Sequence, residues 1–192
     1  SLSVKMRGCY PKGGGVVELR VPLVRELLPI NITEEGLVAR VRGTAFCAKV
    51  SPSVINRTID AARGVLNQLL PDVYIAADAH RGAKSGHSAG YSLQLVAETT
   101  TGVLLSAEFT AGGPTAASTG EMPEDVGTQG AQLLLQEVLR GGVVDCQHQP
   151  VVLMLMAMGP EDVCKVRFGS ELTPQAVRTL QLLRDTFGTV FK

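Results

Sequence analysis

Hydrophobic and polar residues alternate along two short segments at the start of the chain, Leu2–Gly8 and Val16–Val21, and this alternation is typical of β-strands. A proline and three consecutive glycines lie between the two segments. Because glycine and proline dominate tight chain reversals, we predict that the two strands pair around a glycine-rich loop. The residues that follow, Pro22–Glu35, contain two prolines and a charged turn, and we expect a connector there.

A longer alternating segment, Leu37–Val50, predicts the first strand of a compact unit. Ser51 and Pro52 come next, and serine at the N-cap followed by proline at the first helical position is typical of a helix start. Apolar residues recur at helical spacing as far as Leu70, where a proline ends the segment. The predicted helix has an apolar stripe formed by Ile55, Ile59, Ala62, Leu66 and Leu69.

Three further strands are predicted after this helix. Val73–Ala77 is a short apolar segment, and Tyr91–Glu98 and Val103–Phe109 alternate on both sides of a short turn, as the strands of a hairpin do. With the preceding strand and helix they predict a compact α/β unit. The loop Thr110–Gly120, rich in glycine, alanine, serine and threonine, is the boundary that we expect after this unit.

The remaining residues predict a second unit made mainly of helices, so the fold class that we expect is α/β (α+β). A continuous apolar run in this part predicts a helix that is buried on all sides. Thr173 and Gly188 are expected to cap the last helix, whose predicted apolar face is Val177, Leu180, Leu183 and Phe187. The predicted elements are helices over Pro123–Arg140, Pro150–Met158 and Pro174–Phe187 and a strand over Val163–Phe168.

The charge and composition of the chain restrict the kinds of molecule that it is expected to bind. The chain has 192 residues with 18 basic and 18 acidic side chains, so it lacks the overall positive charge that marks many nucleic-acid-binding domains. RNA contacts would therefore depend on local basic patches. No apolar run reaches the ~18 residues of a membrane-spanning helix, and we expect no membrane partner. Cys9, Cys47, Cys146 and Cys164 show no metal-binding spacing, and we expect buried thiols in a reducing compartment.

The loop between the first two strands is the strongest candidate for chemistry. Gly13, Gly14 and Gly15 could offer several backbone N–H groups to an anion, with the side chains of Arg7 and Lys12 beside them. A simple turn between two strands accounts for the same residues. Both interpretations remain open on the residues alone.

The stretch from Arg7 to Val17 reads R-G-C-Y-P-K-G-G-G-V-V, and it resembles the signature of the RNA 3′-terminal phosphate cyclase family. Similar stretches extend over almost the whole chain. Arg42–Ala45 resembles the start of the insert domain of the family, and Leu95–Thr100 resembles its closing hairpin. Pro123–Gly127 resembles the opening of the last repeat of the main domain.

The resemblance implies a main domain of three similar α/β repeats, with an insert domain before the third repeat. On this basis we expect residues 1–35 to be the end of the second repeat and a connector. We expect residues 36–111 to be the insert domain and residues 112–192 to be the third repeat. The chain would then be the C-terminal half of a full-length member.

True cyclases of this family adenylylate a histidine in the strand-to-helix loop of the third repeat, and then convert an RNA 3′-phosphate to a 2′,3′-cyclic phosphate. The corresponding loop here, Gly169–Thr173, contains no histidine, and none occurs after His148. Glu171 cannot replace the imidazole, because a carboxylate would place negative charge against the phosphate that is attacked. The chain therefore looks closer to the cyclase-like branch, which lacks this histidine.

The resemblance to this branch implies a role in ribosome biogenesis without cyclase activity. Its members join the small-subunit processome with a large GTPase, and they are needed for the early cleavages that release 18S rRNA in the nucleolus of the nucleus. We expect pre-rRNA and the ribosome-assembly GTPase as partners, with no cofactor, no metal and no catalytic residue. An active RNA 3′-terminal phosphate cyclase, or an endoribonuclease that cuts pre-rRNA, stays open as the alternative.

Two groups of residues are the candidate contacts. Lys165 and Arg167 alternate on a short predicted strand beside an apolar, methionine-rich segment, and we predict that they contact the protein partner. The residues predicted to contact the RNA backbone or another anion are Arg7, Lys12, Gly13, Gly14, Gly15 and Arg42.

Other titratable residues have structural explanations. His80 and His87 flank a loop and are expected to be exposed, with a nuclease or metal site as the alternative. His148 is expected at a helix start with its imidazole bonded to the backbone. Glu98 and Glu108 fall on neighbouring hairpin strands, where we expect a solvated sheet face, with a pair of catalytic carboxylates as the alternative.

Overall fold

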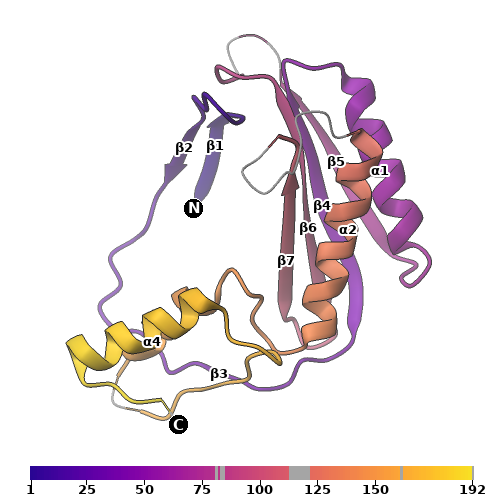
Figure 1. Ribbon diagram of the computed structural model, residues 1–192. Helices are drawn as coiled ribbons and strands as arrows, with labels where there is room; N and C mark the ends of the chain where they lie inside the picture. Colours follow the sequence, from indigo (N-terminus) through magenta and orange to yellow (C-terminus); the bar gives the residue numbers. More distant parts are fainter. Residues whose placement is uncertain (81, 83–84, 113–121, 161, 192) are drawn as a thin grey trace.

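A four-stranded sheet forms the centre of the best-packed part of the molecule (Figure 1). The strand order is β5-β4-β6-β7; β4 runs parallel to β5 and antiparallel to β6, and β6 runs antiparallel to β7. The strands are β4 (Val38–Ala48), β5 (Val73–His80), β6 (Gly90–Thr99) and β7 (Leu104–Thr110). The structure is a computed structural model that describes residues 1–80, 82, 85–112, 122–160 and 162–191.

Two helices, α1 (Pro52–Leu66) and α2 (Pro123–Arg140), cover one face of this sheet (Figure 1). They pack on each other and on the strands. Alternate strand residues point toward the helices, as the two-residue period of a strand requires. The core between the two layers includes Val41, Ala45, Leu93, Leu95, Leu105, Ile55, Leu66, Val126 and Leu134.

This packing groups α2 with the sheet that it covers. The predicted division before residue 112, which assigns α2 to the third repeat, stays a prediction; in the structure the apolar face of α2 is buried against α1, β6 and β7. Most of the predicted boundary loop, Thr110–Gly120, lies outside the described residues. The structure therefore joins residues 38–110 and α2 in one layered unit.

The start of α1 follows from its sequence, but its end differs from the prediction. The Ser51 hydroxyl accepts a hydrogen bond from the N–H of Ser53, with proline at the first helical position. The helix ends at Leu66 and not at Leu70, because the chain tightens into a turn in which the N–H groups of Gln68 and Leu69 donate to carbonyl oxygens three residues back, at 3.4 and 3.1 Å. The strand after the turn, β5, continues past the predicted end at Ala77.

The second face of the sheet is open and largely polar. Alternate residues of β4, among them Arg40 and Arg42, point to this face. The register sets Glu98 opposite Leu104 and Glu108 opposite Gln94, so the two glutamates are not neighbours. The alternative of a carboxylate pair is therefore wrong, and the expected position on the less buried sheet face is confirmed.

A separate hairpin stands at the start of the chain. β1 (Leu2–Met6) and β2 (Val16–Leu19) are antiparallel, which confirms the predicted pairing around the glycine loop. The connector then leads to β3 (Asn31–Ile32), which runs parallel to β8 (Lys165–Val166). The predicted strand Val163–Phe168 thus shrinks to two paired residues, because β3 offers only two residues for pairing.

The last part of the chain contains α3 (Gln149–Ala157) and α4 (Pro174–Phe187), which pack on each other. A small second core forms there around Leu153, Ala176 and Leu183. Thr173 and Gly188 cap α4 as predicted: the Thr173 hydroxyl accepts from the N–H of Ala176, and Gly188 has a left-handed conformation.

Two burial predictions for these helices are wrong. α3 is not buried on all sides, because Val151 and Met154 are 45% and 41% exposed. In α4, Phe187 is 65% exposed and Val177 is also exposed. Among the described helices and strands the main partner of each is the other, so their outer apolar residues face solvent. Among the cysteines, Cys9 and Cys47 are buried as expected, whereas the other two are half-buried; in the described structure none of the four forms a disulfide.

Candidate functional site

The glycine loop, residues 7–15, lies against residues 85–90, which precede β6, at the upper end of the sheet in Figure 1. Lys12 also donates its N–H to Oγ of Ser88 at 3.0 Å. The loop is therefore bound by main-chain groups to a segment that is distant in the sequence. The bonds run from the Gly86 N–H to the Arg7 carbonyl oxygen at 2.6 Å and from the His87 N–H to the Gly13 carbonyl oxygen at 2.9 Å.

The Arg7 side chain crosses from the glycine loop to the open face of the sheet. Its Nε and Nη2 donate to Oδ2 of Asp78 at 3.1 and 2.8 Å, and its guanidinium carbon lies 4.8 Å from the centre of the Phe46 ring. Nε2 of His80 lies 2.6 Å from Oδ1 of the same carboxylate. The charge of Arg7 is thus neutralised within the protein. His80 is a half-buried strand residue and not the exposed loop residue that we predicted.

Two lysines lie at the outer edge of this junction. The exposed side chain of Lys12 has no ion-pair partner within the described part of the chain. Lys49 follows β4 with a left-handed backbone (φ 58°), and its Nζ donates to the carbonyl oxygen of His87 at 3.2 Å. His87 itself is exposed, as predicted. Both lysines therefore lie next to residues 85–90, where an anion could approach from solvent.

Arg42 lies elsewhere, on the open face of the sheet. Its Nη1 and Nη2 donate to Oδ1 and Oδ2 of Asp72, both at 2.8 Å. Hydrogen bonding to Arg42 lowers the pKa of Asp72. Arg40 forms a similar fork with Glu98 and lowers the pKa of that carboxyl in the same way. The basic residues of β4 are therefore paired with carboxylates.

The structure thus brings together five of the six predicted RNA contacts and separates the sixth. Arg7, Lys12 and the three glycines share one loop. Arg42 lies four residues along β4 from Phe46, which is about 13 Å at the usual rise of a strand. Lys49 is not among the predicted contacts, because its unusual backbone conformation gives no signal in the sequence.

The second predicted contact region lies around β8. The N–H of Lys165 donates to the carbonyl oxygen of Ile30 at 2.8 Å, and the side chain of Lys165 has no ion-pair partner in the described ranges. Arg167 is different, because its Nε lies 3.0 Å from Oε1 of Glu35. Lys165 is therefore the freer of the two cations.

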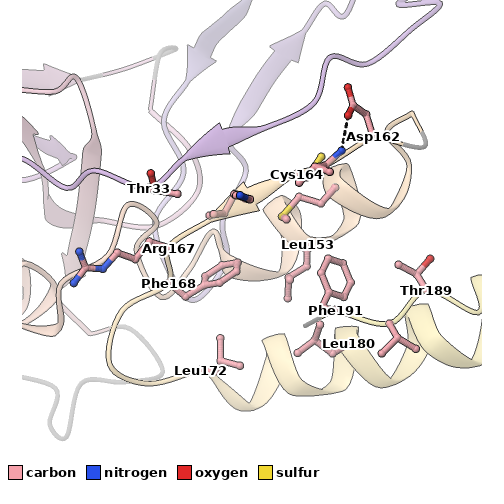
Figure 2. Close-up of a pocket in the computed structure, with 15 residues that line it drawn as sticks. Thr33, Leu153, Asp162, Cys164, Arg167, Phe168, Leu172, Leu180, Thr189 and Phe191 are labelled. Atoms are coloured by element: carbon pink, nitrogen blue, oxygen red, sulfur yellow. Dashed lines mark hydrogen bonds between the residues drawn. The ribbon is translucent and has the colours of Figure 1, made fainter.

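A groove of about 990 Å³ adjoins these residues, between α3, the strand β8 and α4. In Figure 2 the side chains of Leu153, Leu180 and Phe191 point toward one another, whereas the guanidinium group of Arg167 points away from them. The lining is mainly apolar. The groove thus combines an apolar floor with basic residues along one side.

A buried carboxylate, which the sequence did not reveal, joins this region to the sheet. Oδ2 of Asp145 accepts hydrogen bonds from the N–H and the hydroxyl of Ser106 at 2.9 and 2.8 Å. Oδ1 accepts from the N–H of His148 and lies 2.7 Å from its Nδ1. Burial raises the pKa of Asp145, but these hydrogen bonds outweigh it and hold the pKa below its ordinary value. His148 thus stands at the start of α3, as predicted, but its imidazole bonds a carboxylate instead of the backbone.

The loop 169–173, where true cyclases carry their histidine, is held by a second buried residue. Gln149 is 1% exposed; its Nε2 donates to the carbonyl oxygen of Glu171 at 3.1 Å, and its Oε1 accepts from the N–H of Thr173 at 2.9 Å. Both polar ends of the amide are therefore occupied by the loop. A glutamine in an apolar run was the available signal, because a buried amide needs such partners.

Within the described residues, no group of three or more histidine, cysteine, aspartate or glutamate side chains has an arrangement that could hold a metal ion. The search of the described helices for one long and apolar enough to cross a membrane found none.

Comparison with known proteins agrees with this geometry. The family described as RNA 3′-terminal phosphate cyclase (RTC), insert domain, matches residues 33–139, a span that contains the four-stranded sheet, α1 and nearly all of α2. A human protein named RNA 3′-terminal phosphate cyclase-like protein is 44% identical over 191 residues, which cover 100% of this chain and 51% of the human protein. The matched domain therefore includes the helix that packs on the sheet.

Relatives in distant organisms also match the whole of this chain and about half of their own length. A Dictyostelium discoideum protein, named probable RNA 3′-terminal phosphate cyclase-like protein, is 42% identical over all of this chain and 54% of its own length. A Schizosaccharomyces pombe protein named rRNA processing protein rcl1 is 40% identical over all of this chain and 52% of its own length. The chain spans about half the length of the curated relatives that it matches. It belongs to the RNA 3′-terminal phosphate cyclase family, with the cyclase-like proteins as its relatives.

Proposed function

We propose that this chain is part of an rRNA-processing factor that lacks cyclase activity. The support is its membership of the family and its similarity to the Schizosaccharomyces pombe relative that is named an rRNA processing protein. The finer proposal is a nucleolar factor of the small-subunit processome, needed for early pre-18S cleavage together with a large assembly GTPase.

The observation that carries the non-catalytic role is the loop 169–173. It contains no imidazole, and Gln149 occupies its main-chain groups at Glu171 and Thr173. A cyclase needs a nucleophile that can take up AMP, and the carboxylate of Glu171 is repelled by the phosphate that it would attack. The third-repeat loop is therefore better suited to a fixed structural role.

RNA contact is proposed at the junction of the glycine loop and residues 85–90. Lys12 and Lys49 supply cations there that are not paired with a carboxylate in the described structure. Phosphate contacts of this kind give affinity without sequence information and weaken with salt. Arg7 and Arg42 are held by Asp78 and Asp72, so they contribute to RNA affinity less than the lysines do.

Contact with the GTPase is proposed along the groove beside β8. The apolar floor around Leu153 and Phe191 suits an apolar segment of a partner, and Lys165 and Arg167 suit acidic residues next to that segment. Charge reversal at Lys165 should weaken the complex more than reversal at Arg167, because Glu35 already neutralises Arg167.

The test is a depletion experiment with the full-length protein from which this chain comes. Cells depleted of that protein should accumulate uncleaved pre-rRNA and lose 18S rRNA, and the wild-type protein should restore both. Lys12→Ala should restore processing less well than Lys5→Ala, a matched change of a lysine that pairs with Glu18. Normal pre-rRNA levels after depletion would contradict the proposed function.

A further inference from the structure

Glycines pack closely across the contact between the glycine loop and residues 85–90, and glycine is required there at residues 86 and 90. A Cβ atom on Gly14 would lie 2.5 Å from the ring of His87. A Cβ atom on Gly86 would lie 2.3 Å from the carbonyl oxygen of Gly13, and one on Gly90 would lie 2.7 Å from the Cβ of Cys9. All three distances are below van der Waals contact. At Gly86 and Gly90 the atom met is a backbone oxygen or a Cβ, so the two backbones approach as closely as they do there only because these side chains are missing, whereas the exposed ring of His87 beside Gly14 can turn away.

Bonds of two kinds close the same contact. Residues 7 and 13 accept main-chain hydrogen bonds from residues 86 and 87. The Arg7 side chain reaches further, to Asp78 at the end of β5, and covers the Phe46 ring. A charge-assisted fork of this kind is stronger than a neutral hydrogen bond and fixes the direction of the side chain. The contact is therefore a defined interface and not a loose meeting of two loops.

This contact lies at the end of the insert domain that is opposite its two chain connections. The chain enters the domain at the start of β4 and leaves it at the end of α2, and both points lie at the lower end of the sheet in Figure 1. The glycine loop meets the upper end, a full strand length away. An eleven-residue strand such as β4 is about 36 Å long. Without a second attachment, the insert domain would pivot about its two chain connections.

We infer that the glycine loop is a latch, which docks on residues 85–90 and fixes the orientation of the insert domain relative to the N-terminal hairpin. The glycines of the family signature then serve close packing between two parts of the chain. This inference concerns the fold of the chain itself and is independent of the proposed RNA contact by Lys12, whose side chain points to solvent.

The test compares two glycines that have the same backbone conformation. Gly14 has φ 82° and packs against His87, whereas Gly102 has φ 84° in the turn between β6 and β7, with open space around it. Alanine strains the backbone at both positions because both have positive φ, but only in Gly14→Ala does the added methyl group also displace His87 from the loop. In Gly14→Ala the amide hydrogens of Gly86 and His87 should exchange with solvent about tenfold faster or more, since local opening sets exchange rates. In Gly102→Ala their exchange should be unchanged.

A second variant covers the case in which Gly14→Ala does not fold. Arg7→Gln removes the bonds to Asp78 and should accelerate exchange at the same two amides, whereas Arg57→Gln, which removes an exposed pair with Glu124, should not. Exchange in the core of the sheet, at Leu93 for example, should stay slow in all folded variants. The inference is overturned if both amides keep their protection in Gly14→Ala and Arg7→Gln, or if the core accelerates equally with them.

Discussion

The pairing state of each charged side chain decides what this surface can bind. Arg7 and Arg42 have the charge that an RNA phosphate attracts, but each already donates two hydrogen bonds to an aspartate. A phosphate would have to break these bonds first, and the aspartate left behind would repel it. Lys12 carries no such partner in the described structure. The sequence does not distinguish the three cations. The structure indicates that Lys12 is more available to an RNA phosphate than Arg7 or Arg42.

We predict that Lys12→Ala weakens binding of single-stranded pre-rRNA fragments more than Arg42→Ala does. If Lys12 contacts one phosphate, its loss should also reduce the slope of log K against log salt by about 0.7, the value for one phosphate contact on a single strand. Fluorescence anisotropy of the full-length protein across a salt series measures both quantities. Lys5→Ala is the control, and an equal loss of affinity in this control would argue against a specific contact at Lys12.

Asp145 is a buried carboxylate whose charge is stabilised by its hydrogen-bond partners. Its carboxylate is 4% exposed and satisfies two groups of Ser106 and two of His148. It fixes the start of α3 to the edge strand β7. We predict that Asp145→Asn lowers the free energy of unfolding by about 1–3 kcal/mol at neutral pH, as expected when a buried hydrogen-bonded charge is lost.

The same substitution has a pH signature. The pKa of Asp145 is lower in the folded protein than its ordinary value, so the stabilisation is complete above about pH 4 and disappears as pH falls through the folded-state pKa. The difference between wild type and Asp145→Asn should therefore shrink when urea unfolding is repeated from about pH 6 down to about pH 3. A difference that stays constant with pH would show that the carboxylate charge is not the cause.

At the scale of elements, the helix pair α1 and α2 depends on a close approach at one glycine. A Cβ atom on Gly127 of α2 would lie 2.3 Å from the carbonyl oxygen of Thr58 in α1. Gly64, also in α1, is exposed and has no neighbour within 4 Å of an added Cβ. The two glycines look alike in the sequence, but only Gly127 is needed for packing.

We predict opposite effects of alanine at these positions. Gly64→Ala should stabilise the protein by about 0.5–1 kcal/mol, because alanine loses less backbone freedom in a helix. Gly127→Ala should destabilise it by about 1–3 kcal/mol, because the added methyl group forces the helices apart. Thermal or urea unfolding of both variants measures this, and stabilisation by Gly127→Ala would contradict the close helix contact.

Local signals in the sequence predicted most elements, and their failures have physical causes. Capping residues placed the starts of α1 and α4 correctly. The continuous apolar run of α3 predicted burial on all sides. Because such a run shows no helical periodicity, it does not indicate how many faces of the helix pack against other elements. β8 was overestimated for a similar reason, since strand length depends on the partner strand. The bonds of Asp145 to Ser106 and the partners of Gln149 in the loop 169–173 could not be predicted, because they join segments that are apart in the sequence.

At the scale of the whole molecule, exposed apolar residues are unevenly distributed. The layered unit around the sheet buries most of its large hydrophobic side chains. The hairpin, the connector and the last two helices expose many of theirs, and Leu23 and Leu28 are 92% and 84% exposed. Exposed apolar surface of this extent is usual where more protein packs. The chain spans about half the length of its relatives, which agrees with such packing.

We predict that a fragment of residues 33–145 folds independently and stays monomeric, because it contains all the described buried residues of the main core. The whole 192-residue chain should bind a hydrophobic dye more strongly per molecule and should self-associate with concentration. Light scattering after size-exclusion chromatography and dye fluorescence measure these properties. A monomeric whole chain that binds no more dye than the fragment would contradict this prediction.

The proposed lack of cyclase activity is tested most directly by covalent labelling of the full-length protein with radioactive ATP. We expect no protein-bound AMP on the native protein when a true cyclase is labelled in parallel, because the loop 169–173 has no histidine. Glu171→His serves as a second sample and shows whether the surrounding loop could support the reaction. Covalent AMP on the native protein would contradict the account, because a nucleophile and an active cyclase chemistry would then have to exist elsewhere in the protein.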